Sequence, residues 1–326
     1  MHSINIAHRL SLANIDRAAA VIDPIFIHTP QFESEPLAHE LGCPRDCHLT
    51  LKVETVNPLR SFKGRGADFF MHEMSDALGD GALVCASAGN FGQAMAYVCR
   101  ARKRSLIVYT ATTANALKVA RMRALGAEVR MHSDDFTAAK EMARQYGRDS
   151  GASFVEDGFE ANLAEGAGTI ARELLERHTF DTVLVPVGDG ALITGMGRWI
   201  KAHAPATQVI GVCARGADAM LASWQQSRVV ARAETSTIAD GIAIRIPVTQ
   251  AVADLSGTVD DIALVADESI VRAMRIIFAT TGLVVEPAGA VGIAALMEHP
   301  RLRAGRMATV LTGGNLTGEQ VLQWLV

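Results

Sequence analysis

The stretch Ser61-Phe62-Lys63-Gly64-Arg65-Gly66 places one lysine between an aromatic residue and a glycine, shortly after Asn57 and Pro58. A lysine amine becomes a nucleophile once it has lost its proton, a loss that burial and nearby cations favour. Such an amine forms a Schiff base with a carbonyl compound. Lysine next to glycine is also common in solvated loops. The stretch therefore gains its meaning from other motifs in the chain.

A second motif, Ser87-Ala88-Gly89-Asn90-Phe91-Gly92, follows the apolar run 82–86 and precedes a helical pattern from Gln93 to Arg104. A strand that becomes a helix through small residues presents unpaired backbone N–H groups, which bind a carboxylate or a phosphate. The same composition also forms an ordinary turn between a strand and a helix. The motif is thus a candidate site for an anionic group.

Two further glycine-containing segments also lie at predicted strand ends. Gly188-Asp189-Gly190-Ala191-Leu192 lies between a strand-like run, 182–187, and a helical pattern, 193–203. Its glycines let the backbone approach a phosphate, whose charge a helix N-terminus favours. Thr312-Gly313-Gly314-Asn315 follows a short strand at 307–311 and combines a hydroxyl with room for a flat ring. A plain turn explains either segment taken alone.

Short apolar strands alternate with helical patterns along nearly the whole chain. For example, the sequence predicts strands at 105–109 and 127–131 and helices at 115–125 and 136–146. This alternation is typical of a doubly wound α/β protein. The predicted fold class is therefore α/β.

Taken in order, the four motifs resemble the fold type II family of pyridoxal-phosphate enzymes, and specifically its threonine/serine dehydratase branch. Nearly the whole chain takes part, including the segments 117–118, 125–129, 238–243 and 286–290. The resemblance implies two open, twisted, mostly parallel sheets flanked by helices, as in the tryptophan synthase beta type. It also implies a small domain, 67–154, that closes over the substrate and is inserted into a large cofactor-binding domain, 1–66 and 155–326.

The resemblance implies pyridoxal phosphate as the cofactor and Lys63 as the catalytic residue, joined to the cofactor as a Schiff base. Phe62 and Gly241 would flank the cofactor ring. Asn90 would hydrogen-bond the ring hydroxyl, and Thr312 would face the ring nitrogen. The loop expected to hold the phosphate comprises Gly188, Asp189, Gly190, Ala191 and Leu192. The residues expected to bind the substrate are Ser87, Ala88, Gly89, Asn90 and Phe91.

Thr312 favours an elimination reaction, because a neutral hydroxyl does not keep the ring nitrogen protonated and the cofactor is then a weaker electron sink. Lys63 would take the α-proton as general base. The β-hydroxyl would leave as water, so that an L-3-hydroxy amino acid yields an α-keto acid and ammonia. Related racemases carry a serine at the position of Ala88, and alanine cannot donate a proton. Racemisation is therefore expected to be minor.

Three departures from the dehydratase pattern qualify the expected site. Phe91 replaces the usual histidine, which extends the expected substrates from threonine and serine to a bulkier one such as phenylserine. Asp189 replaces a glycine beside the expected phosphate, so we expect its side chain to point outward, because like charges repel. Where relatives have a metal-binding glutamate, Asp218 stands alone, and hard cations require several oxygen ligands. No metal is predicted.

The motifs leave two other functional classes open. A β-replacement synthase of the cysteine or threonine synthase type would add a second nucleophile after elimination. A non-catalytic cofactor-binding protein would have kept the fold without turnover. The Asp240-Gly241-Ile242-Ala243 and Ser61-Phe62-Lys63 segments favour the dehydratases.

The composition of the 326 residues is that of an ordinary soluble enzyme. A formal net charge of −4 gives no basic surface for nucleic acid, and no long apolar run predicts a membrane span. The first five residues lack the pattern of a signal peptide. We therefore expect a cytoplasmic enzyme that binds a small amino-acid substrate. Family members are often homodimers, which the sequence neither supports nor opposes.

Overall fold

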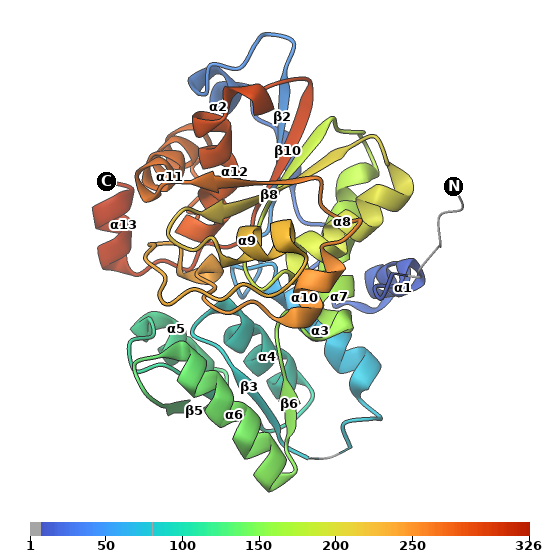
Figure 1. Ribbon diagram of the computed structural model, residues 1–326, viewed down its shortest axis with the longest axis vertical. Coiled ribbons are helices and arrows are strands. Elements are labelled where there is room, and N and C mark those ends of the chain that lie inside the picture. Colours follow the sequence, from blue (N-terminus) through green and yellow to red (C-terminus); the bar gives the residue numbers. More distant parts are fainter. Residues whose placement is uncertain (1–7, 80) are drawn as a thin grey trace.

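The computed structural model describes residues 8–79 and 81–326 of the chain. Its strands form two sheets, a six-stranded one with the order β1-β2-β10-β7-β8-β9 and a four-stranded one with the order β5-β4-β3-β6. Neighbouring strands are parallel except for the pair β1 and β2. Helices flank both sheets (Figure 1). The predicted α/β fold class with two mostly parallel sheets is confirmed.

The six-stranded sheet is built from both ends of the chain. Its strands are β1 (Gln31–Glu33), β2 (His48–Val53), β7 (Thr182–Pro186), β8 (Gln208–Ala214), β9 (Asp261–Val265) and β10 (Arg306–Leu311). The α-helices in this part of the chain are α1 (Leu12–Val21), α2 (Glu35–Glu40), α3 (Lys63–Met74), α7 (Ala161–Leu175), α8 (Ala191–His203), α9 (Ala219–Gln226), α10 (Thr249–Asp254), α11 (Asp267–Thr281), α12 (Pro287–Glu298) and α13 (Gly318–Trp324). Two short 3-10 helices, Asp240–Ile242 and Pro300–Leu302, complete it.

Helices cover both faces of the six-stranded sheet at β7, which explains the apolar run in this strand. In β7, Leu184 packs into the core formed with α11 and α12. Its neighbours Val183 and Val185 pack on the opposite face, into the core formed with α7 and α8. A parallel strand covered by helices on both faces reads as a continuous hydrophobic run, because successive side chains alternate between the faces.

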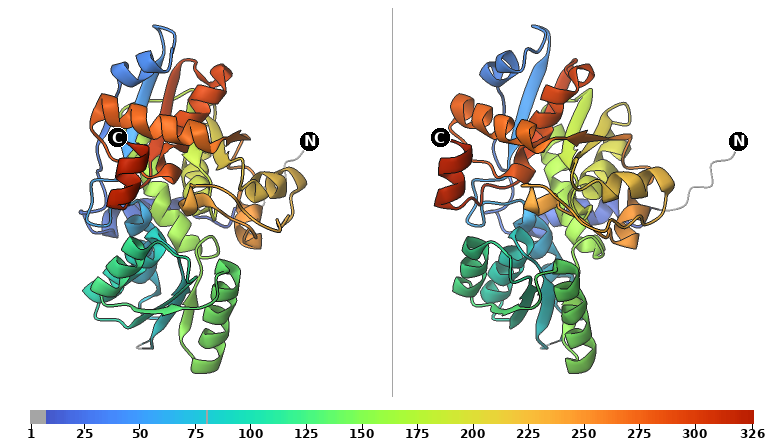
Figure 2. Two further views of the ribbon diagram at one scale, coloured as in Figure 1. Left: turned by 90° about the vertical axis from the view of Figure 1, so that its left-hand side faces the viewer. Right: turned by 60° about the vertical axis from the view of Figure 1, so that its left-hand side comes forward.

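The four-stranded sheet comes from one continuous part of the chain. Its strands are β3 (Leu83–Ala86), β4 (Leu106–Thr110), β5 (Glu128–Met131) and β6 (Ser153–Val155), and its helices are α4 (Asn90–Ala101), α5 (Ala116–Ala124) and α6 (Phe136–Ser150). These elements lie together at one end of the molecule, drawn in teal and green (Figures 1 and 2). The division into domains at residues 66 and 154 stays a prediction.

Several predicted helix boundaries in this region are wrong. Helix α4 ends at Ala101 and not at Arg104, and helix α6 ends at Ser150 and not at Tyr146. Helix α4 begins at Asn90 and not at Gln93. The physical reason is the Ser87 hydroxyl, which accepts hydrogen bonds from the backbone N–H groups of Gly89 at 3.1 Å and Gly92 at 2.8 Å. This local capping satisfies donors that the first turn leaves free, so the helix starts as soon as the turn ends.

Within the described ranges, every helix is too short or too polar to cross a membrane. The first five residues, in which we found no signal-peptide pattern, lie outside the described part of the chain.

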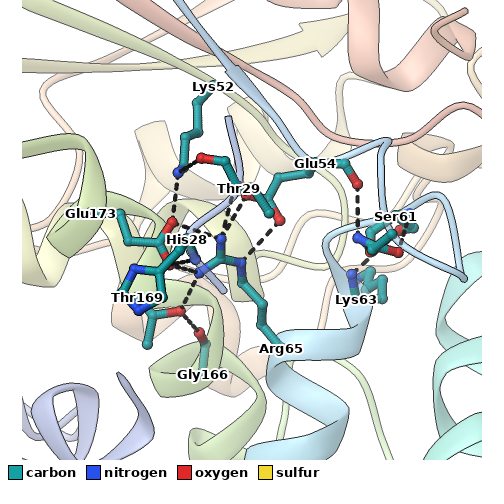
Figure 3. Close-up of polar contacts among 11 residues, drawn as sticks. His28, Thr29, Lys52, Glu54, Ser61, Lys63, Arg65, Gly166, Thr169 and Glu173 are labelled. Atoms are coloured by element: carbon teal, nitrogen blue, oxygen red, sulfur yellow. Dashed lines mark hydrogen bonds and ion pairs between the residues drawn. The ribbon is translucent and has the colours of Figure 1, made fainter. Parts of the chain in front are cut away.

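A buried ionic network joins the start of α3 to α7 and β2 (Figure 3). The fully buried Arg65 donates to both carboxylate oxygens of Glu54, each at 2.9 Å, and contacts both of those of Glu173, at 2.5 and 2.9 Å. Lys52 of β2 donates to Glu173 at 2.6 Å. Burial alone would raise the pKa of Glu173, but Arg65 and Lys52 outweigh it and lower the pKa to about 2. The network therefore fixes the turn of α3 that carries Lys63.

Replacing Arg65 tests how much stability depends on this network. We expect Arg65→Met to lower the free energy of unfolding by about 3–5 kcal/mol, because it leaves two buried carboxylates without their main partner. Urea denaturation measures the loss. Arg17→Met breaks a more exposed pair with Glu73 and serves as the control, for which we expect a loss below about 1 kcal/mol. Equal losses in the two variants would contradict the prediction.

Candidate active site

All the residues predicted to form the site line one cavity of about 370 Å³. They come from segments far apart in the chain and are Phe62, Lys63, Ser87, Ala88, Gly89, Asn90, Phe91, Gly188, Asp189, Gly190, Ala191, Leu192, Gly241 and Thr312. The structure thus brings the four motifs together. The role assigned to each residue stays a prediction.

Lys63 is the first residue of α3 and extends its amine into the cavity. Its backbone N–H donates to the Ser61 hydroxyl at 3.3 Å (Figure 3). The side chain is 18% exposed, and Nζ forms an ion pair with the carboxylate of Asp157. Nζ also lies 4.8 Å from the centre of the Phe62 ring. The amine is therefore shielded from most solvent and held by one carboxylate.

The turn from Ser87 to Phe91 directs the N-terminus of α4 toward the cavity. The first backbone N–H groups of this 12-residue helix have no partner within the helix, and they suit a carboxylate. A Cβ atom at Gly92, in the first turn of α4, would press on the sulfur of Met122 and on the Cβ of Ser87, so a small residue fits best there. Phe91 is 5% exposed and packs into the core beside the four-stranded sheet while it also lines the cavity.

Asn90 is held by a chain of amide and carboxylate contacts. Its Nδ2 donates to Glu286 Oε1 at 2.5 Å, and its Oδ1 accepts from Asn315 Nδ2 at 2.8 Å. Arg121 donates in turn to the side-chain oxygen of Asn315. The amide orientation of Asn90 is therefore set by Glu286 and Asn315, which lie more than 190 residues later in the chain.

A buried lysine lies behind the same turn. Lys118 Nζ donates to Asp240 Oδ2 at 2.8 Å and lies 3.6 Å from Glu286 Oε2. Among the described residues, Glu286 Oε2 has no hydrogen-bond partner. Burial raises the pKa of Glu286, whereas for Lys118 the two carboxylates outweigh burial and raise the pKa. Lys118 thus supplies positive charge next to Gly89. A Cβ atom added at Gly89 would lie 3.6 Å from Lys118 Nζ.

The loop 188–192 brings a second helix N-terminus to the cavity. Gly190 caps the 13-residue helix α8 with a φ of +98°, a conformation that glycine adopts without strain. A Cβ atom at Gly188 would lie 3.0 Å from the carbonyl oxygen of Gly241, so the two loops pack closely. The free N–H groups at the start of α8 suit a phosphate.

Asp189 lies between this cavity and a larger neighbouring one. The larger cavity has a volume of about 1110 Å³ and shares several lining residues with the first, namely Thr113, Asp134, Phe136, Asp189, Thr235, Ala243 and Ile244. Burial raises the pKa of Asp189 to about 6, while Lys140 opposes this shift and Asp157 adds to it. The residue is only partly exposed. The charged groups that act on its carboxylate are Lys140, Asp157, Lys63 and Glu156.

In addition to Asp134, four charged residues of the cavity were given no role by the sequence. Lys118, Asp240 and Glu286 belong to segments that carry the family resemblance, so their positions were already marked. Asp157 belongs to no motif. The signal that could have found it is its place just after β6, because sites in α/β folds gather at the carboxyl ends of strands.

Asp218, where the sequence predicted no metal, does not line this cavity. The carboxylate of Asp218 is bound by Arg232 through two contacts of 2.7 Å. In the described part of the chain, no group of three or more His, Cys, Asp or Glu side chains has the arrangement of a metal site.

The cavity matches the chemistry of a phosphorylated aromatic aldehyde. It offers a shielded amine at Lys63, a glycine-lined helix N-terminus at 188–192 and a buried hydroxyl at Thr312. A side chain larger than glycine at 241 would press on Ala288, whose Cβ would be 3.0 Å away. These features fit an amine-reactive ring with a phosphate at one end.

Comparisons with known proteins agree with this chemistry. The family model described as pyridoxal-phosphate dependent enzyme matches residues 22–313. The catabolic L-threonine dehydratase TdcB of Staphylococcus aureus strain N315 is 28% identical over 319 residues, which cover 96% of this chain and 91% of that protein. The structure of maize serine racemase superimposes with a TM-score of 0.88 at 25% identity and covers 96% of each chain. The processed form of threonine deaminase isoform 2 from Solanum lycopersicum superimposes with a TM-score of 0.85 at 26% identity and covers 96% of this chain and 88% of that one.

The family match spans most of the chain, and its segments converge on one cavity that contains a suitable lysine. The chain belongs to the family of pyridoxal-phosphate dependent enzymes.

Proposed function

We propose that the protein is a lyase that dehydrates and deaminates an L-3-hydroxy amino acid to an α-keto acid and ammonia. The observation that carries this proposal is the meeting of Lys63, two helix N-termini and the Thr312 hydroxyl in one cavity. A relative named threonine dehydratase matches the sequence over nearly the whole chain, and a protein named threonine deaminase shares the fold to the same extent. Their names support a hydroxy amino acid as the substrate.

In this proposal, each end of the cavity holds a different anionic group. The N–H groups of the loop 188–192 hold the cofactor phosphate, and those of the turn 87–91, with the Ser87 hydroxyl, hold the substrate carboxylate. Phe62 and Gly241 flank the ring, Asn90 binds its hydroxyl, and Thr312 faces its nitrogen. Pyridoxal phosphate supplies an electron sink for the bonds at the α-carbon when it is bound.

Lys63 carries out the proton transfer in the proposed reaction. As a neutral amine it removes the α-proton, and the electron pair left by that bond forms a double bond between the α- and β-carbons. The β-hydroxyl leaves as water by taking up the proton that Lys63 has gained. Hydrolysis of the released product then gives the keto acid and ammonia. Because Ala88 has no proton to donate to the opposite face of the substrate, we propose that racemisation is minor.

A β-replacement synthase is the alternative. It would require a second nucleophile, such as a thiol, and would form no keto acid in good yield without it. A bound cofactor with no turnover of any hydroxy amino acid would instead favour the non-catalytic class.

The family resemblance supports several further proposals about the whole molecule. We propose that residues 67–154 form a small domain that closes over the substrate and that 1–66 with 155–326 form the large one. We also propose a cytoplasmic location and a homodimer.

Product release from purified, cofactor-loaded protein tests the reaction. We expect α-keto acid and ammonia from at least one of L-threonine, L-serine and L-threo-phenylserine, without added nucleophile. Lys63→Ala should lower the rate at least about 100-fold, because it removes the general base. Lys201→Ala changes a lysine of α8 outside the cavity and should keep the activity. Release that persists in Lys63→Ala would refute the role of Lys63.

The same assay tests whether Phe91 forms an apolar wall for the substrate side chain. We expect Phe91→His to raise the ratio of kcat/KM for L-threonine over L-threo-phenylserine about 10-fold, since a lost apolar contact changes discrimination by about 1–3 kcal/mol. Thermal melting checks that the variant is folded. An unchanged ratio would count against the wall.

Asp189 should make cofactor binding depend on pH. Below a pH of about 6 its carboxyl is protonated and neutral, and above it the carboxylate repels the phosphate. We expect Asp189→Asn to bind pyridoxal phosphate about as tightly as wild type at pH 5 and about 5–10-fold more tightly at pH 7.5. Titration of the apoprotein by absorbance measures both affinities. A constant ratio across this range would show that Asp189 does not affect the phosphate.

A further inference from the structure

Asp157 makes the one ion pair that reaches the site lysine in the described part of the chain. It lies in the connection between β6 and α7, and its carboxylate contacts Lys63 Nζ. Both side chains are largely buried, with 18% of Lys63 and 11% of Asp157 exposed. The pair lies inside the cavity that the two residues line. A contact so shielded is screened by salt and water far less than a surface ion pair.

The backbone around Asp157 is fixed on both sides. On one side, Glu156 Oε1 pairs with Lys140 at 2.7 Å and Oε2 with Arg144 at 3.0 Å, both from α6. On the other side, Gly158 has a φ of +81° and packs so closely on Asp189 that a Cβ atom would collide with the Asp189 carbonyl oxygen. Asp157 is therefore held in place relative to both α6 and the loop 188–192.

Among the charged groups around this pair, Lys63 is the cation available to Asp157. The other charged or titratable groups near it are Lys140, Glu156, Asp189 and the buried thiol of Cys85. Lys140 is already paired with Glu156. Asp189 is a carboxyl and cannot neutralise Asp157. The Lys63 ammonium is thus the cation that this carboxylate is placed to meet.

We propose that Asp157 is a positioning residue that orients Lys63 Nζ and stabilises the ammonium formed when Lys63 takes up a proton. The proposal rests on the proposed function, in which Lys63 is the general base. A base works best when a third group fixes its direction and balances the charge that it gains. The carboxylate of Asp157 does both.

The step balances without any further reactant. The α C–H bond breaks, its proton bonds to the neutral Nζ, and its electron pair forms the double bond between the α- and β-carbons. The bond from the β-carbon to the hydroxyl oxygen breaks with its electrons on oxygen, which leaves as water by taking up the proton that Nζ has gained. Nζ carries one positive charge between these two proton transfers, and Asp157 exchanges no proton. The residue touches neither the substrate nor the reacting carbon in this scheme, so it acts through Lys63.

The first experiment follows exchange of the α-hydrogen of L-alanine for deuterium in D2O by proton NMR. Alanine has no β leaving group, so the exchange reports on the base and not on elimination. We expect cofactor-loaded Asp157→Asn to exchange about 10–100-fold more slowly than wild type, and Asp157→Glu to recover part of the rate. Asp218→Asn breaks the pair with Arg232 outside the cavity and should exchange at the wild-type rate.

The second experiment uses the apoprotein and does not depend on turnover. The rate at which Lys63 reacts with pyridoxal phosphate is measured against pH, with borohydride trapping and mass spectrometry to locate the modified lysine. In Asp157→Asn the ammonium loses its partner, so we expect the rising limb of the profile to move about 1–2 pH units lower. Asp157→Glu should restore the wild-type profile. A merely structural role would lower the rate at every pH without moving the limb.

The outcomes separate this inference from the proposed function. Wild-type exchange and an unshifted profile in Asp157→Asn would overturn the inference, and so would a failure of Asp157→Glu to restore either readout. Normal exchange in wild-type enzyme, with no keto acid from any hydroxy amino acid, would overturn the dehydratase alone. The Asp157 inference would then still be judged by its two readouts.

Discussion

The buried guanidinium of Arg65 is the group on which the geometry of the site depends. It stands two residues after Lys63 and joins α3 to Glu54, which follows β2, and to Glu173 of α7. With Lys52, the network removes four charges from water, which is costly, and only dense hydrogen bonding in a fixed geometry offsets that cost. Once the network is made, α3 cannot shift along α7 without breaking it. The position of the Lys63 amine is in this way set by residues that never enter the cavity.

Helices α4 and α8 direct their N-termini into the same cavity, and charged side chains lie beside each N-terminus. Helix α4 is backed by the buried Lys118, whose own neighbours are Asp240 and Glu286. Helix α8 has two carboxylates beside it, Asp157 and Asp189, which oppose an anion at that end. Each end of the cavity therefore combines a helix N-terminus with one lysine and two carboxylates, Lys118 with Asp240 and Glu286 at α4 and Lys63 with Asp157 and Asp189 at α8.

Much of the fold was predictable because its signals are local. The run 182–187 predicted a strand, and β7 occupies 182–186. The motifs around Lys63, Asn90 and Gly190 mark strand-to-helix turns, whose chemistry is written in adjacent residues. The start of α4 was misplaced because the capping by Ser87 depends on a side-chain rotamer, which the sequence does not show. The ion pair of Asp157 joins residues 94 positions apart, and the contact of Asn90 with Glu286 spans 196. Such pairs follow from tertiary packing, which no local pattern encodes.

The wide cavity beside the site bears on what becomes of a short-lived product. At about 1110 Å³ it is roughly three times the size of the inner cavity, and the two share part of their lining. An enzyme that must hand a reactive species to a second reagent gains from sealing it away from water. An enzyme whose product is completed by hydrolysis loses nothing when its cavity is open to solvent, because water completes the reaction both in the cavity and in solution. The large neighbouring cavity is thus compatible with a deaminating enzyme, and it would be a disadvantage to an enzyme that must keep its intermediate away from water.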